Sequence, residues 1–241
     1  MKAYIITGVS KGIGLELAKQ VSKAGHFVVG IARTECELDE MKFIQADLSI
    51  TENLESMMNE IIDSVPQNIG SFTLINNAGM VDPIGLIGTV SAEEMTKAIA
   101  VNLTAPMIIS NTFISKLKGF EGSKRIVNIS SGAGRNAYEG WGTYCATKAG
   151  LDHFSRVVAL EQLNAKHPVE IVSIAPGIID TGMQEAIRAS NKEAFPLLER
   201  FIDYKEQGVL SSPEQTAQKL ISFIENKDFK EVGPIVDIRK F

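Results

Sequence analysis

Short, almost continuously apolar runs alternate with longer amphipathic stretches from one end of this sequence to the other. Such runs suit strands that are buried on both faces of a parallel sheet, and the amphipathic stretches suit helices that cover it. We therefore expect an α/β fold with a doubly wound, Rossmann-type, seven-stranded parallel sheet and helices on both faces. The strands are expected at residues 3–7, 27–32, 42–46, 72–76, 125–130, 170–175 and 234–238, and the helices at roughly 13–24, 53–65, 92–117, 142–164 and 213–225.

The 241 residues are expected to form a single domain, 1–241. One α/β domain of this length is common, and no linker, repeat or low-complexity tract interrupts the alternation. The segment 177–212 differs, because it is polar and helical and no predicted strand divides it. It follows the strand at 170–175, at the edge where open α/β sheets bind ligands. We interpret it as a helical insertion that binds the substrate.

Charge and composition exclude several functions. The chain carries 24 Lys and Arg against 29 Asp and Glu, and its basic residues are scattered, so we expect no nucleic-acid partner. No apolar run approaches the length of a membrane span, so we expect no membrane partner. Two cysteines, Cys36 and Cys145, form no CxxC pair and fit a reducing cytoplasm, where we place the protein. The three histidines lack metal-ligand spacing, so we expect no metal.

A glycine-rich turn joins the first predicted strand to the first helix. Gly8 permits the tight turn, Gly12 lets the backbone approach a pyrophosphate, and Gly14 lets the helix pack against the strand. The helix N-terminus then presents free N–H groups to phosphates. Since the turn lies within a βαβ unit, it predicts a dinucleotide site rather than a structural turn alone.

The end of the second predicted strand indicates which dinucleotide binds. An NAD site would carry Asp or Glu there for the ribose 2′-hydroxyl, but this chain has Arg33 and Thr34. Arg33 would reach a 2′-phosphate, and Lys11 adds a second cation on the same side. Both could instead be solvated surface cations. Together with the missing acid, the pair favours NADP(H) over NAD(H).

Three residues predict the chemistry. Tyr144 and Lys148 stand four residues apart on a predicted helix and so share one face, and Ser131 ends the preceding strand. A nearby ammonium should lower the pKa of the tyrosine and favour proton exchange. Tyr144 could then protonate a carbonyl oxygen as hydride reaches its carbon, while Ser131 donates a hydrogen bond to the same oxygen.

With the glycine turn, these residues resemble the short-chain dehydrogenase/reductase family over the full chain. The resemblance implies that Asp47 and Leu48 contact adenine, that Asn102 holds a proton-relay water, and that residues 76–79 brace the sheet beside the cofactor. It assigns catalysis to Ser131, Tyr144, Lys148 and Asn102. It assigns cofactor binding to Gly8, Ser10, Lys11, Gly12, Ile13, Gly14, Arg33, Asp47, Leu48, Asn77, Ala78, Gly79, Tyr144, Lys148, Pro176, Gly177, Ile179 and Thr181.

Residues 140–146, 176–184 and 229–237 resemble a narrower branch, that of sepiapterin reductases and bacterial benzil reductases. This likeness implies that Asp237 anchors substrate, although an edge-strand carboxylate that discourages pairing would look the same. Trp141 either walls the substrate pocket or packs in the core. One departure from the family is that residues 33–41 leave little room for its usual second helix. The long helices at 92–117 and 142–164 pair between subunits in this family, which implies a homodimer or homotetramer.

We therefore expect an NADPH-dependent carbonyl reductase that acts on a ketone or 1,2-diketone, with substrate contacts from Ser131, Trp141, Tyr144 and Asp237. One alternative is an NAD-dependent alcohol dehydrogenase of the same family. Arg33 argues against it, because NAD has no 2′-phosphate for this side chain to bind. Another alternative is a nucleotide-sensing protein without catalysis. Such a protein has no use for a proton relay, yet the chain retains Ser131, Tyr144, Lys148 and Asn102. Both alternatives remain open on the sequence.

Overall fold

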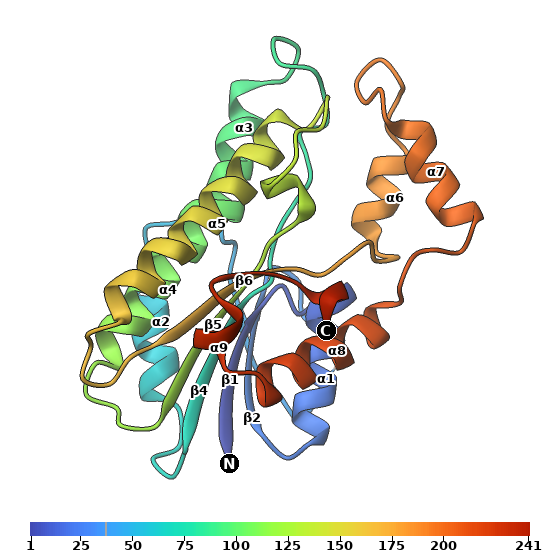
Figure 1. Ribbon diagram of the computed structural model, residues 1–241. Helices are drawn as coiled ribbons and strands as arrows, with labels where there is room; N and C mark the ends of the chain where they lie inside the picture. Colours follow the sequence, from blue (N-terminus) through green and yellow to red (C-terminus); the bar gives the residue numbers. More distant parts are fainter. Residues whose placement is uncertain (37) are drawn as a thin grey trace.

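A seven-stranded parallel sheet runs through the computed structural model, which describes residues 1–36 and 38–241 (Figure 1). Its strand order is β3 (Lys42–Gln45), β2 (Phe27–Ala32), β1 (Lys2–Thr7), β4 (Ser71–Asn76), β5 (Ser123–Ile129), β6 (Glu170–Ala175) and β7 (Ile235–Asp237). The expected doubly wound sheet is confirmed, and the order reverses direction between β1 and β4. Because ligands bind beyond the carboxyl ends of strands at such a reversal, the fold itself selects one edge of the sheet for a site.

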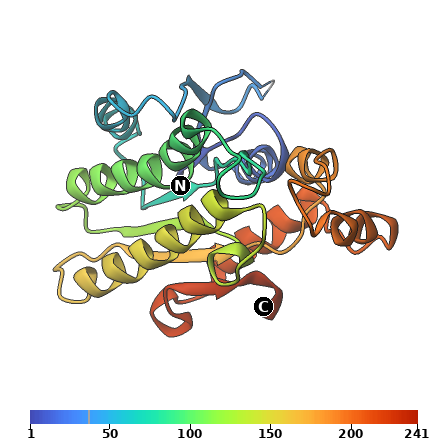
Figure 2. The same ribbon diagram turned by 90° about the horizontal axis from the view of Figure 1, so that it is seen from above.

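Helices cover both faces of the sheet (Figures 1 and 2). On one face lie α2 (Leu54–Asp63), α4 (Ala105–Lys116) and α5 (Gly142–Gln162), and on the other α1 (Gly12–Lys23) and α8 (Pro213–Asn226). Successive side chains of a strand point to opposite faces, so β1 serves two cores: Ile5 packs on the α2–α4 side and Ile6 on the α1–α8 side. This double burial is why its sequence is continuously apolar.

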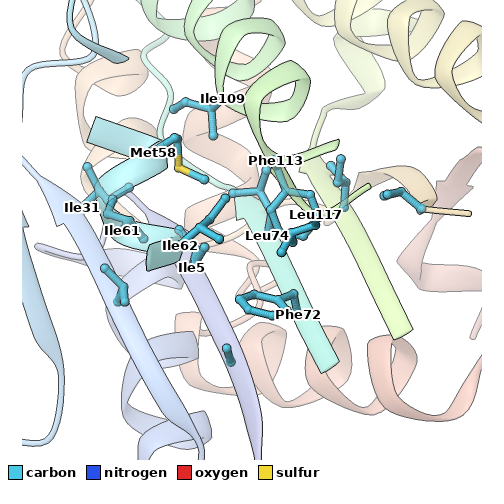
Figure 3. Close-up of a cluster of buried hydrophobic side chains, with 14 of the residues drawn as sticks. Ile5, Ile31, Met58, Ile61, Ile62, Phe72, Leu74, Ile109, Phe113 and Leu117 are labelled. Carbon is cyan, nitrogen blue, oxygen red and sulfur yellow. The ribbon is translucent and has the colours of Figure 1, made fainter. Parts of the chain in front are cut away.

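The core on the α2–α4 side interlocks large apolar side chains (Figure 3). Phe72 and Leu74 rise from β4 toward Phe113 on α4, and the rings of Phe72 and Phe113 meet edge to face at 6.5 Å. Phe113, Leu74 and Ile109 are each 0% exposed. Packing of this density leaves little freedom for α4 to slide along the sheet, which holds the residues at its N-terminal end in place.

The helix expected at 92–117 is present but interrupted. It consists of α3 (Ala92–Ile99), a π-helical turn η1 (Ala100–Thr104) and α4. Pro106 cannot donate a hydrogen bond to the carbonyl of Asn102, four residues earlier, so an unbroken α-helical ladder is impossible here. The wider turn places Asn102 inside the fold, where it is 1% exposed.

This same stretch, Ala92–Lys116, is long and apolar enough by length and composition to cross a membrane, which the sequence analysis overlooked. Its α4 part packs against α2 and the sheet through Ala105, Ile109 and Phe113, all fully buried. The apolar character therefore reflects its place as a core helix of this fold.

The segment 177–212 contains α6 (Gly182–Arg188) and α7 (Leu198–Glu206), and both views place these helices beyond the sheet (Figures 1 and 2). A single bridge between Ile179 and Ser211 closes the base of the segment. The chain then enters α8 through a capping box formed by Ser212 and Gln215. Short helices α9 (Phe229–Val232) and η3 (Ile238–Lys240) flank β7.

Between β2 and β3 the described residues, 33–36 and 38–41, form no helix, as the short spacing predicts. Met41 packs instead over Gly30 of β2, where a Cβ atom would overlap its sulfur. Glu37 lies outside the described residues.

Phe113→Ala should lower the free energy of unfolding by about 3–5 kcal/mol, because it removes a ring that is 0% exposed and leaves a cavity between α4 and β4. Urea titration followed by circular dichroism measures the loss. Asn111→Ala, an exposed position on the same helix, is the matched control and should change stability by less than about 0.5 kcal/mol. Equal effects from both variants would contradict this description of the core.

Candidate active site

The turn after β1 has the backbone that its glycines predict. Gly8 and Gly12 have positive φ values of +75° and +61°, which other residues rarely adopt. At Gly14 a Cβ atom would overlap the carbonyl oxygen of Gly8, so only glycine lets α1 approach the strand this closely. No side chain among the described residues caps the N-terminus of α1, so its first N–H groups stay free for an anion.

Hydrogen bonds fasten this turn to the end of β4. The Thr7 hydroxyl accepts from the backbone N–H groups of Asn77 and Ala78, both at 3.0 Å. The Asn77 amide donates back to the carbonyl oxygens of Thr7 at 2.8 Å and Gly8 at 3.2 Å. Thr7 was missed in the sequence analysis, although a β-branched hydroxyl residue at the carboxyl end of a strand is a signal worth searching for. The two strands on either side of the reversal are therefore locked in register where the site forms.

A cavity of about 1140 Å³ opens at this edge of the sheet. It is lined by the expected cofactor residues apart from Gly14, whose role is to let α1 pack: Gly8, Ser10, Lys11, Gly12, Ile13, Arg33, Asp47, Leu48, Asn77, Ala78, Gly79, Tyr144, Lys148, Pro176, Gly177, Ile179 and Thr181. Ser131 and Trp141 line it too, whereas Asn102 and Asp237 do not. These lining residues come from seven separate chain segments, which converge on one hollow that is large enough for a dinucleotide and a small substrate.

The three residues expected to carry the chemistry lie together. Ser131 follows β5, and its hydroxyl accepts from the N–H of Ala133 at 3.1 Å, which orients it. Tyr144 and Lys148 extend from the first turns of α5 and are 7% and 4% exposed. The Lys148 ammonium donates to the carbonyl of Ile129 at 2.8 Å and lies 5.7 Å from the centre of the Tyr144 ring.

Burial dominates the titration of this pair. It raises the pKa of Tyr144 to about 12, opposed in part by a hydrogen bond with the Ser131 side chain. It lowers the pKa of Lys148 to about 8, opposed by the charge of Asp152. The expectation that the ammonium lowers the tyrosine pKa is wrong for this geometry, because the cost of burying a phenolate exceeds the attraction of Lys148. The Tyr144 phenol therefore keeps its proton across the ordinary pH range.

Asn102 sits behind the cavity and supports its wall. Its side-chain oxygen accepts from the N–H of Met80 at 2.9 Å, and its amide donates to the carbonyl of Met80 at 2.8 Å. The same amide contacts the Thr147 hydroxyl at 3.3 Å, on the helix that carries Lys148. Asn102 thus joins three segments: the π-helical turn, the loop after β4 and α5.

The opposite end of the cavity holds the charged residues expected near adenine and its ribose. Asp47 accepts from the Ser49 N–H at 2.9 Å and hydroxyl at 2.8 Å, and the backbone hydrogen bond lowers the pKa of its carboxyl despite partial burial. Arg33 is exposed directly after β2, and its carbonyl accepts from the Gln45 amide at 3.0 Å. The Lys11 ammonium lies 3.5 Å from where a Cβ at Gly182 would be, so it leans toward α6.

Aromatic rings form the wall nearest Tyr144. The Trp141 ring stacks on Phe195 at 4.8 Å and meets Tyr144 and Phe201 edge to face at 5.5 and 5.1 Å. Trp141 both packs in this cluster and lines the cavity, so the two roles expected as alternatives coexist. Phe201 and Tyr204 come from α7 in the segment 177–212 and were missed, because nothing in a sequence says which side of an isolated helix will face a cavity.

Asp237 does not reach the cavity. Its carboxylate accepts from the Arg239 side chain at two points, Nε at 2.9 Å and Nη2 at 2.6 Å, and from the Arg239 N–H at 3.0 Å. The tight turn of η3 directly after β7 makes this local pairing possible. Arg239, rather than Asp237, lines the cavity, so a substrate contact by Asp237 stays an expectation.

No group of three His, Cys, Asp or Glu side chains that could hold a metal ion occurs in residues 1–36 and 38–241.

The short-chain dehydrogenase family model matches residues 2–192, and the chain belongs to this family, whose members are oxidoreductases that act on CH–OH and C=O groups. The chain is 42% identical to a benzil reductase ((S)-benzoin forming) of Bacillus cereus, over 99% of each protein. It is 29% identical to the sepiapterin reductase of Mus musculus, over 97% of this chain and 95% of that one.

A crystal structure of a short-chain dehydrogenase/reductase from Saccharomyces cerevisiae shares the fold. Its TM-score is 0.84 at 24% identity, over 99% of this chain and 96% of that one.

Carbonyl reduction by this protein should slow as pH rises, with an apparent pKa of about 8 set by Lys148. Below that value the lysine is charged and Tyr144 is protonated; above it the ammonium is lost while the tyrosine keeps its proton, since its pKa is about 12. A profile of kcat against pH from 6 to 10 measures this. A rate that stays level or climbs to pH 10 would contradict the assignment.

Proposed function

We propose that this protein is an NADPH-dependent carbonyl reductase whose substrates are ketones and 1,2-diketones with aromatic substituents. The convergence of Ser131, Tyr144 and Lys148 on an aromatic-walled cavity carries the proposal. Similarity to benzil reductases over nearly the whole chain supports it. Consumption of NADPH with benzil, and with sepiapterin for comparison, is the direct test.

The cavity suits a dinucleotide in both shape and chemistry. The positive-φ turn at Gly8 and Gly12 and the uncapped α1 N-terminus offer N–H groups for a pyrophosphate. Asp47 offers a carboxylate oxygen to the adenine amine, and Lys148 offers its ammonium to the nicotinamide ribose. When bound, the reduced cofactor would supply the hydride.

The protein's own groups would manage the carbonyl oxygen. Tyr144, whose burial keeps it neutral, donates its phenolic proton to that oxygen as negative charge develops there. Ser131 donates a second hydrogen bond to the same oxygen. Lys148, held by the carbonyl of Ile129, compensates the phenolate left on Tyr144. Asn102 positions α5 through Thr147. Its backbone carbonyl, which Pro106 cannot engage, would hold a water that returns the proton.

The preference for the 2′-phosphorylated cofactor rests on Arg33. It directly follows β2 and lines the cavity, and neither Ala32 before it nor Thr34 after it is acidic. Glu35 lines the same region but comes after the arginine in the chain. Lys11 lies across the cavity mouth and adds positive charge near the phosphates.

The rings of Trp141, Phe201 and Tyr204 suit a flat, apolar substrate, and the segment 177–212 supplies two of them. An NAD-dependent alcohol dehydrogenase would share Tyr144 and Lys148, but Arg33 would have no 2′-phosphate to bind. A nucleotide-sensing protein would have no use for a buried proton donor beside an aromatic pocket. Activity with the two cofactors and with benzil separates these three functions.

Tyr144→Phe should reduce turnover by about 10²–10⁴-fold, because it deletes the proton donor while keeping the ring. NADPH binding and the melting temperature should change little. Tyr4→Phe, at the far end of the sheet from the cavity, is the matched control and should keep its turnover. A Tyr144→Phe enzyme with more than a third of the original rate would remove this residue from the mechanism.

Arg33→Ala should raise the KM for NADPH by about tenfold or more and leave that for NADH nearly unchanged, since a charge-assisted contact contributes roughly 1.5–3 kcal/mol. Lys42→Ala, an exposed cation on the neighbouring strand, controls for the general loss of charge. If the Arg33 variant keeps the original ratio of NADPH to NADH efficiency, the 2′-phosphate is bound elsewhere.

We also propose that the protein is a homo-oligomer, a dimer or tetramer, that pairs through α4 and α5. Large apolar side chains stay exposed along these helices: Ile99 and Met107 near and on α4, and Val157, Leu160 and Leu163 along and after α5. Leu160→Glu should shift the protein toward a monomer in light scattering, because Leu160 is 68% exposed and would be buried on pairing. Ile50→Glu, at a 58% exposed site away from these helices, should not. A monomeric wild-type protein would end this proposal.

A further inference from the structure

The substrate end of the cavity carries positive charge that the reduction itself does not use. Arg239 and Arg200 both line the cavity, beside the aromatic wall formed with Tyr204. The Arg200 guanidinium lies 5.4 Å from the centre of the Tyr204 ring and bonds its phenol oxygen, and no ion pair to Arg200 occurs among the described residues. Neither cation contacts the groups assigned to proton transfer.

Arg239 is paired with a neighbouring carboxylate. Asp237 accepts hydrogen bonds from its Nε and Nη2, and its aliphatic carbons rest against Gly177, 3.7 Å from where a Cβ would be. A guanidinium carries five N–H donors, and Asp237 takes one edge of the fork. The other N–H groups of this guanidinium have no acceptor among the described residues. Arg239 can therefore donate further hydrogen bonds to a ligand.

A second hollow begins where Arg239 stands. It has a volume of about 870 Å³, lies between α7 and α8, and shares Arg239, Tyr204 and Pro176–Ile178 with the main cavity. Its lining among the described residues includes Lys219 and Arg239 but no Asp or Glu, and amides such as Gln207 and Gln215 fill out the polar surface. The two cavities therefore meet at Arg239, and the lining of the second cavity is polar and carries positive charge.

Acidic residues on the α6 side do not cancel this charge. Asp180 is paired with Lys205 and lies 3.9 Å from the Arg188 side chain. Glu185 lies near the Lys11 ammonium, since both approach the position a Cβ would take at Gly182. Asp237 neutralises Arg239 formally, but Arg200 and Lys219 remain unpaired with carboxylates among the residues described.

We propose that the protein's substrates are aromatic ketones that bear an anionic group, a carboxylate in the simplest case, and that Arg239 binds that group where the two cavities meet. This proposal rests on the proposed carbonyl reductase function and narrows its substrate class. Arginine offers only donors, so a group that accepts hydrogen bonds and carries negative charge suits it best. A donor-rich heterocycle such as a pterin would leave the guanidinium unmatched. Arg239 is thus a specificity-determining residue.

The test compares benzil-4-carboxylate with its neutral near-isostere benzil-4-carboxamide at low ionic strength. The wild-type enzyme should show a kcat/KM at least about tenfold higher for the carboxylate, the size expected for a charge-assisted hydrogen bond. Arg239→Gln should reduce this preference to less than about threefold, and Arg239→Lys should restore part of it. Added salt should shrink the preference, because the Arg239 side chain is 64% exposed.

Lys240→Gln is the matched control, since Lys240 is an exposed neighbouring cation that lines neither cavity. It should keep the wild-type preference, and the melting temperature of each variant verifies its fold. Equal kcat/KM for the two compounds in the wild type, or a preference that survives Arg239→Gln, would overturn the proposal.

Calorimetric titration of both compounds into the enzyme with bound NADP⁺ separates this proposal from the function on which it rests. An enzyme that reduces benzil but binds carboxylate and carboxamide equally is a carbonyl reductase without the anion site, and the proposal fails alone. An enzyme that binds the carboxylate at least tenfold more tightly through Arg239 but reduces neither compound retains the site and loses the proposed function.

Discussion

The structure depends on the hydrogen bonds that join the carboxyl ends of β1 and β4. Thr7 and Asn77 exchange hydrogen bonds across the point where the strand order reverses, and Gly14 lets α1 approach the turn at Gly8 without a side chain between them. Every residue that lines the nucleotide end of the cavity is placed relative to this junction. Because the two strands are held at a fixed register, the residues after β4 lie directly beside the turn at Gly8.

The chemistry depends on a second constraint, the burial of Tyr144 and Lys148 on one face of α5. Burial moves the two pKa values apart, upward for the phenol to about 12 and downward for the ammonium to about 8, so at neutral pH both groups keep their protons. The buried rings of Trp141, Phe195 and Phe201 pack together on this side and make the surroundings of Tyr144 apolar. The same rings would hold an aromatic substrate, so one cluster serves both stability and recognition.

Much of the fold was predictable from the sequence because buried parallel strands leave an unmistakable apolar run. The strands at 27–32 and 170–175 have the predicted limits, and the sheet has the seven parallel strands that were expected. The glycine turn was predictable because its backbone needs residues without a Cβ. The π-helical turn was not expected, although Pro106 signals that the ladder must change near Asn102.

Other features depend on contacts that no local pattern records. The pairing of Asp237 with Arg239 occupies the carboxylate of Asp237 and places the Arg239 side chain at the wall of the cavity. The positions of Phe201 and Tyr204 depend on how α7 folds back toward α5, and the pKa of Tyr144 depends on burial rather than on its neighbour four residues away. These are tertiary effects, and they concentrate at the substrate end of the site, where the chain leaves the regular sheet.

The central claim is that this cavity holds the nicotinamide in one orientation against a carbonyl whose oxygen meets Tyr144. Reduction of benzil with NADPH that carries deuterium on one defined face of nicotinamide C4 tests it most directly, with the product examined by NMR. The account predicts one deuterium on the carbinol carbon of each product molecule from one of the two labelled faces, and none from the other. Deuterium delivered equally from both faces, or a benzoin product without deuterium from either, would contradict it.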